Sequence, residues 1–306
     1  MNYTDAKYTT VKQVTMLSII SNILLTCIKF IVGILGNSSA MVGDAAHSLS
    51  DSLTNIAIII GLKISNKPKD KNHPYGHGKV ETLAATFTGL VLIATAIGIF
   101  YEGFQKIIEW YGGGVLPTPS TFAFIIAIFS VVLKEGMYRY TVVKNKDIQS
   151  SALNVIALDH RSDALFSIGT VIGVGGAIFL GTRWVVLDPA TAVLFSILIV
   201  KMGASITYKS IDELMEASLD EEIHQCIIDT LKSGEGILGY HDLKTRKIGS
   251  VVAVDVHIEV NDTLTVVEAH NIATQLEIKL QEVCGKDAHF SIHTEPYPDP
   301  DRLITD

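Results

Sequence analysis

Long apolar stretches separated by short polar segments run along the chain up to about residue 209. Six can be distinguished: residues 14–35, 40–62, 83–101, 121–133 with a more polar extension, a fifth from before residue 159 to near 180, and 190–204. About 20 apolar residues in a helix cross the ~30 Å hydrocarbon core of a bilayer, where backbone polar groups must be paired internally. The pattern therefore predicts an all-α, six-helix transmembrane domain over residues 1–208.

After Lys209 the pattern becomes that of a water-soluble domain. An amphipathic helix is predicted at residues 219–233, strands at 243–248 and 251–260, a helix at 264–283 and a third strand at 289–293. The second strand alternates apolar and polar residues, as in VAVDVHIEV. The order αββαβ predicts a small cytoplasmic α/β domain over residues 209–306, of the ferredoxin or metallochaperone kind.

Composition agrees with a membrane protein and excludes several classes. Of the 306 residues 48% are hydrophobic, and the mean hydropathy is +0.36. The net charge of -8 argues against a nucleic-acid partner. The cysteines Cys27, Cys226 and Cys284 form no CxxC pair, so neither disulfides nor a thiolate metal site is indicated. The polar N-terminus lacks a signal-peptide pattern, and the first apolar stretch is predicted to be a mature spanning helix.

Basic residues indicate the orientation in the membrane. They gather between the second and third stretches and between the fourth and fifth. The residues are Lys63, Lys67, Lys69, Lys71, Lys79, Arg139, Lys144 and Lys146. Because basic loops stay in the cytoplasm, both termini are predicted to be cytoplasmic, in the inner (plasma) membrane of a prokaryotic cell.

Two short motifs place acidic residues and a histidine inside predicted spanning helices. In GDAAHSLSD, His47 and Asp51 are four residues apart and share a helical face, with Asp44 on the same side. In LDHRSD, Asp159 and Asp163 are likewise four apart. A charge at the bilayer centre costs at least about 2.5–3.5 kcal/mol, so these groups need a compensating partner.

The four residues His47, Asp51, Asp159 and Asp163, called here the transport quartet, offer one imidazole and three carboxylates. Four such ligands suit tetrahedral Zn²⁺, and the oxygen-rich set also suits Mn²⁺ or Fe²⁺. The alternative is a proton or substrate path without metal, or pairing with Arg161 or Lys29. Two pairs on separate helices favour a metal.

Two further clusters carry metal-ligand side chains. The loop group, Asp70, His73 and His77, lies in the turn DKNHPYGHGK, which could also be an ordinary surface loop. The cytoplasmic group recurs across the soluble domain, with His241 expected just before the first strand. It comprises His241, His257, His270, His293 and Glu295. His224 and His289 are interpreted as structural.

On the motifs GDAAHSLSD, NHPYGHGKVE and DHRSD, the chain resembles the cation diffusion facilitator family of divalent metal/proton antiporters over nearly its whole length. The resemblance implies that the three clusters are metal sites, the cytoplasmic one binuclear. It also implies a homodimer and a charge pair between Lys79 and Glu216. Many members have aspartate where this chain has Glu295, and zinc exporters often have histidine at Asp159. His160, about 100° around the helix from Asp159, should face elsewhere.

The resulting hypothesis is proton-coupled efflux of a divalent cation from the cytoplasm by alternating access. Manganese or iron is slightly favoured, zinc is close, and cobalt and cadmium fit the same ligands; no organic cofactor is expected. The alternative is a non-transporting metal sensor or scaffold with the same fold. A membrane metalloenzyme would need a motif such as HExxH, which the sequence lacks. A transporter of organic cations would leave the cytoplasmic histidines unexplained.

Overall fold

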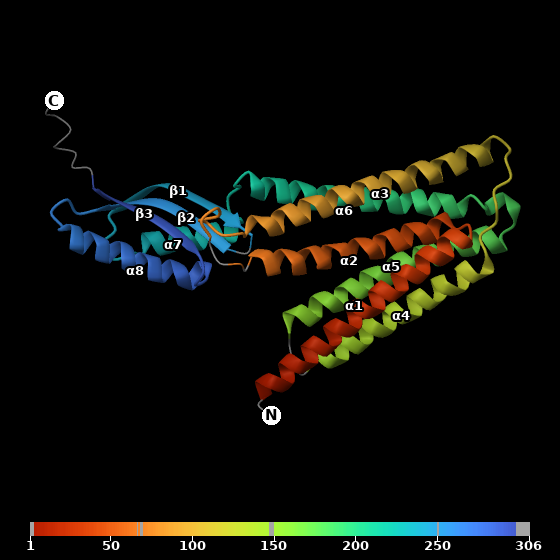
Figure 1. Ribbon diagram of the computed structural model, residues 1–306, viewed down its shortest axis with the longest axis horizontal. Helices are drawn as coiled ribbons and strands as arrows, with labels where there is room; N and C mark the ends of the chain where they lie inside the picture. Colours follow the sequence, from red (N-terminus) through yellow and green to blue (C-terminus); the bar gives the residue numbers. More distant parts are fainter. Residues whose placement is uncertain (1–2, 66, 68–69, 147–149, 250, 298–306) are drawn as a thin grey trace. The chain divides into compact units, whose positions relative to one another are not determined.

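Six long helices form the N-terminal part of the chain, as predicted. The computed structural model describes residues 3–65, 67, 70–146, 150–249 and 251–297, so Lys69 lies outside the described residues. The helices, labelled in Figure 1, are α1 Tyr3–Leu35, α2 Ser39–Ser65, α3 Lys79–Tyr111, α4 Thr121–Asn145, α5 Ser151–Phe179 and α6 Leu187–Leu214. Within the described residues all of them except α2 are long and apolar enough to cross a bilayer.

Several helices extend past their apolar stretches. The fourth stretch ends at Leu133 in the sequence because a lysine follows, yet α4 continues to Asn145. Likewise α3 continues to Tyr111 and α6 to Leu214. Hydropathy detects only the part of a helix that is apolar, whereas backbone hydrogen bonding continues wherever no breaker intervenes.

The chain forms two compact units. The first contains residues 1–57 and 87–207, and the second contains 58–86 and 208–306. In the first unit α1, α4 and α5 pack against one another (Figure 1). Small residues allow close helix packing in membranes. A Cβ on Gly89 of α3 would lie 2.9 Å from the backbone oxygen of Gly203 in α6.

The start of α2 is capped by a residue from α6. Asp188 accepts hydrogen bonds from the Ser38 hydroxyl at 2.7 Å, the Ser39 N–H at 2.6 Å and the Ala40 N–H at 3.2 Å. The first N–H groups of a helix have no partner within it, and a carboxylate there also suits the helix dipole. Asp188 thereby ties the helix that carries His47 to α6.

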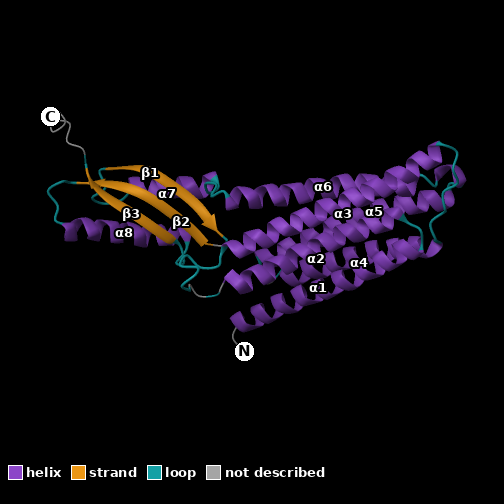
Figure 2. Ribbon diagram, turned by 45° about the horizontal axis from the view of Figure 1, so that its top comes forward, coloured by secondary structure: helices purple, strands orange, loops and turns teal. Residues whose placement is uncertain are grey.

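The second unit contains the α/β domain, with α7 Glu221–Lys232, β1 Gly239–Ile248, β2 Val251–Val260, α8 Val266–Cys284 and β3 His289–Pro296. The sheet order is β1-β2-β3, with β1 antiparallel and β3 parallel to β2 (Figure 2). Alternate residues of β2, such as Val256 and Ile258, pack into a core with Ile227 of α7 and Leu280 of α8. The predicted αββαβ order is confirmed.

One prediction about β1 is wrong. His241 was expected before the first strand, but the strand begins at Gly239 and includes it. The register shifts between His241 and Lys244, and Asp242 has a positive φ of 51°. A β-bulge of this kind interrupts the alternation of apolar and polar residues, so the sequence pattern reveals only the part of the strand that follows it.

Candidate metal transport site

Helices α2 and α5 bring most of the transport quartet together. Ligand atoms of His47, Asp51 and Asp163 all lie within 4.8 Å of one another. His47 Nε2 is 3.7 Å from Asp163 Oδ1, and both side chains are buried. The four-residue spacing on each helix is what turns these side chains toward the same point.

Asp159 lies one turn before Asp163 on α5 and is not part of this close trio among the described residues. Its side chain is half-buried, and its charge acts on Asp51. The Asp51 carboxyl is also within hydrogen-bonding reach of Asp163. Acidic groups this close repel one another when ionised, and a shared proton or a bound cation relieves the repulsion.

Lys134 of α4 is the residue that the sequence analysis missed. Its ammonium group donates hydrogen bonds to Asp163 Oδ2 and to Asn22 Oδ1 of α1. The Lys134 and Asp163 side chains are each only 2% exposed. The signal was present, since an ionisable residue inside a spanning helix is expected to have a partner, but Lys134 was assigned to the polar extension of the fourth stretch.

The basic residues considered from sequence pair elsewhere. Lys29 contacts Asp44 at 2.9 Å, with both side chains almost completely buried. Arg161 contacts Glu135 at 3.0 Å on a more exposed face. Asp44, the third ionisable residue of the GDAAHSLSD motif beside His47 and Asp51, is therefore neutralised by Lys29 and is not part of the close trio.

His160 is not part of the close trio and contacts α1 instead. It is buried, and its Nε2 lies 2.9 Å from the Ser18 hydroxyl of α1. Its place next to Asp159 in the sequence therefore does not make it a neighbour of the three clustered ligand atoms.

The loop group comes together in the second unit. Ligand atoms of Asp70, His73 and His77 lie within 4.8 Å of one another. Asp70 is 3.2 Å from His73 Nδ1 and 3.4 Å from His77 Nε2. Backbone hydrogen bonds from His73 and then Asn72 hold the pKa of the Asp70 carboxyl below its usual value. The turn thus keeps an ionised ligand facing two imidazoles.

The cytoplasmic histidines form a row across the sheet. His241 pairs with His257, and His257 with His293, in the register of the three strands. Glu295 lies 3.1 Å from His241, 3.0 Å from His257 and 3.3 Å from His293. Burial raises the pKa of Glu295, but hydrogen bonds from His241 and His257 outweigh it and leave that pKa below its usual value.

His270 is not one of the strand residues that form this row. It lies on α8 and lines a surface hollow with Thr294, Glu295 and Pro296. In the described residues the close trio of ligand atoms consists of His241, His257 and Glu295.

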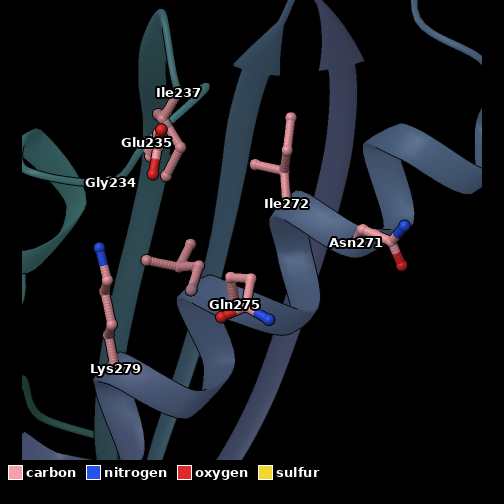
Figure 3. A pocket seen from close by; sticks show the side chains of 8 residues that line it. Gly234, Glu235, Ile237, Asn271, Ile272, Gln275 and Lys279 are labelled. Carbon is pink, nitrogen blue, oxygen red and sulfur yellow. The ribbon is translucent and has the colours of Figure 1, made fainter.

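A second hollow of the domain lies between α8 and the connection from α7 to β1 (Figure 3). Its polar lining consists of Glu235, Asn271, Gln275 and Lys279. None of the predicted metal ligands lines this hollow.

Lys79 and Glu216, predicted as a charge pair, are 3.0 Å apart. The hydrogen bond from Lys79, followed by the charges of Lys79 and Arg246, holds the pKa of Glu216 below its usual value. The pair joins the start of α3 to the segment after α6, both within the second unit.

The apolar helices of the first unit define an integral membrane protein, and comparison with known proteins identifies it as a cation transporter and gives its family. Residues 15–215 match the cation efflux transmembrane domain, and residues 219–297 match the cytoplasmic domain of cation efflux proteins. The chain belongs to the cation diffusion facilitator family, whose members transport metal cations out of the cytoplasm.

Curated relatives match along most of their length. Metal tolerance protein 2 of Oryza sativa subsp. japonica is 32% identical, covering 92% of this chain and 77% of the relative. The manganese efflux system protein MneP of Bacillus subtilis (strain 168) is 30% identical, covering 94% and 96%. The manganese efflux system protein MneS of the same organism is 32% identical, covering 92% and 94%.

Proposed function

We propose that the protein exports a divalent transition-metal ion from the cytoplasm in exchange for protons, and that the transport quartet carries the ion. The approach of His47, Asp51 and Asp163 to within 4.8 Å supports this most directly. An imidazole with carboxylate oxygens is a suitable ligand set for first-row divalent metals. Asp159, one turn before Asp163 on α5, is the proposed fourth ligand.

Proton coupling follows from the same groups. Asp51 and Asp163 are close enough to share a proton in the metal-free site. A metal requires deprotonated ligands, so its binding displaces protons and protons compete for the site. Alternating exposure of the quartet to the two sides of the membrane would then exchange protons for metal.

Manganese or iron is slightly favoured as the exported ion, with zinc close and cobalt or cadmium also compatible. Three carboxylates in the quartet suit the harder ions. The relatives MneP and MneS are named manganese efflux system proteins, which supports manganese among these ions.

The loop and cytoplasmic groups are proposed to sense metal load and to stabilise a homodimer. Both belong to the second unit, whereas the quartet belongs to the first. Both termini would lie in the cytoplasm, with the chain in the inner membrane of a prokaryotic cell.

Flux into proteoliposomes tests the proposal. Purified protein would be offered Mn²⁺, Fe²⁺, Zn²⁺, Co²⁺ and Cd²⁺ with and without a pH gradient. We expect flux that requires the gradient and that Asp51→Ala and Asp163→Ala abolish. Full transport by those variants would refute the quartet. Metal binding without any flux would instead favour the sensor or scaffold alternative.

A further inference from the structure

Lys134 is in direct contact with the transport quartet. Among the described residues, the quartet forms a single ion pair with a lysine or arginine, between Lys134 and Asp163. Lys29 is engaged by Asp44, and Arg161 by Glu135. Among the described residues, the buried ammonium group of Lys134 therefore forms an ion pair with the quartet and with no other acidic residue.

The two oxygens of Asp163 face different partners. Oδ2 accepts from Lys134, whereas Oδ1 faces His47 Nε2 at 3.7 Å. Asn22 accepts a second hydrogen bond from the same ammonium group. Lys134 therefore occupies one oxygen of Asp163 and leaves the other turned toward the site where the ion would bind.

The charges of these groups add up in a simple way. Ionised Asp51, Asp159 and Asp163 contribute three negative charges, and a neutral His47 contributes none. The positive charge of Lys134 reduces the total to two negative charges. A divalent cation then makes the occupied site neutral, which is the state least costly to hold in a low-dielectric interior.

We propose that Lys134 is a positioning residue that adjusts the net charge of the transport site to match a divalent ion. Its positive charge compensates the carboxylate that Asp159 adds to those of Asp51 and Asp163. It acts through Asp163, whose Oδ1 it keeps directed at His47. This inference rests on the proposed function. It implies that without Lys134 the site holds the ion too tightly and releases it slowly, because a unit positive charge at contact distance strongly opposes a second cation.

Substitutions at Lys134 separate charge from hydrogen bonding. Lys134→Gln removes the charge and keeps an N–H donor for Asp163, whereas Lys134→Arg keeps the charge. In proteoliposomes with Mn²⁺ we expect Lys134→Gln to lower both the apparent KM and the maximal rate by about tenfold. Lys134→Arg should stay within about threefold of the unsubstituted protein in KM, since its charge is retained.

Charge rescue gives the decisive comparison. Asp159→Asn alone should raise KM about tenfold, because the site then carries one negative charge fewer. Combining it with Lys134→Gln restores the total, and KM should return to within about threefold of the original. A KM for Lys134→Gln that is unchanged or higher would overturn the inference, and so would a double variant no better than Asp159→Asn.

Two controls keep the result interpretable. Size-exclusion chromatography of each variant checks that it is folded. If Lys134→Gln alone does not fold, Asp159→Asn/Lys134→Gln is compared with Asp159→Asn/Lys134→Arg. KM should return to within about threefold of the original only in the glutamine variant, and an equally raised KM in both would overturn the inference. If the KM values of the Lys134 variants do not follow these expectations while Asp51→Ala remains inactive, the role of Lys134 is refuted. The proposed transport function is then unaffected.

Discussion

The imidazole of His47 stacks on the ring of Phe166, with centroids 3.7 Å apart and planes inclined by 19°. Phe166 is on α5, three residues after Asp163, so the helix that supplies a carboxylate also supplies the surface on which the imidazole rests. Phe166 in turn contacts Phe195 of α6 at a centroid distance of 5.0 Å. The orientation of His47 is therefore set by aromatic packing as well as by its own helix.

Removing this stacking should weaken metal transport without abolishing it. An aromatic pair contributes about 0.5–1.5 kcal/mol beyond its buried area, so Phe166→Leu is expected to raise the apparent KM for Mn²⁺ about two- to tenfold. Phe166→Tyr keeps the ring and is the matched control. Equal KM values for the leucine and tyrosine variants in proteoliposome flux would show that the stacking does not orient His47.

The buried ion pair of Lys29 and Asp44 is expected to stabilise the folded protein and not to take part in transport. Lys29→Met leaves an uncompensated buried carboxylate, which typically costs about 3–5 kcal/mol. The double variant Lys29→Met/Asp44→Asn removes both charges and should recover most of that loss. Thermal unfolding of the detergent-purified protein measures the difference. The double variant is also expected to transport, and its inactivity would show that Asp44 serves the transport site.

The pair of Lys79 and Glu216 should give a pH-dependent contribution to stability. Hydrogen bonding by Lys79 lowers the pKa of Glu216, so the ionised form is favoured in the folded state. Its contribution is complete above the ordinary glutamate pKa of about 4.3 and disappears as the pH falls through the lowered folded value.

Unfolding temperatures of the protein and of Glu216→Gln would check this from pH 7 downward. The difference between them should be constant down to about pH 5 and shrink at lower pH. Lys79→Met should behave like Glu216→Gln. A difference that grows on acidification would contradict the assigned direction of the pKa shift.

The cytoplasmic row should bind metal without being needed for flux. Glu295 contacts all three histidines of the row, so Glu295→Gln should lower the affinity for Zn²⁺ or Mn²⁺ more than a change at His289, which is outside the row. Isothermal titration of the full chain measures the affinity, with His289→Asn as the control. Proteoliposome flux should stay above about half in Glu295→Gln, because the row lies outside the quartet; complete loss of flux would place it in the transport path.

The sequence predicted the elements well where periodicity alone decides them. The limits of β2 agree with the prediction at both ends, because apolar and polar residues alternate regularly from Val254 to Val260. The α4 helix was cut short because Lys134 looked like its polar end, although the lysine is buried against Asp163. Hydropathy treats each residue separately and cannot register a charge whose partner lies on another helix.

The clustering of side chains was predictable only within one element. The spacing in GDAAHSLSD and LDHRSD gave the faces of α2 and α5, but the distance between those faces depends on helix packing. For the same reason Asp44 was grouped with His47, whereas the structure pairs it with Lys29 across α1 and α2. The place of His270 beside Glu295 in one surface hollow likewise depends on where α8 lies against the sheet.

The histidine row has a consequence for how the sheet assembles. His241, His257 and His293 stand opposite one another on three strands, and successive side chains of a strand point to opposite faces. A slip of one residue in either pairing would turn one imidazole into the apolar core beneath the helices. A metal ion bound by this row would therefore stabilise the observed alignment of the three strands relative to alignments shifted by one residue.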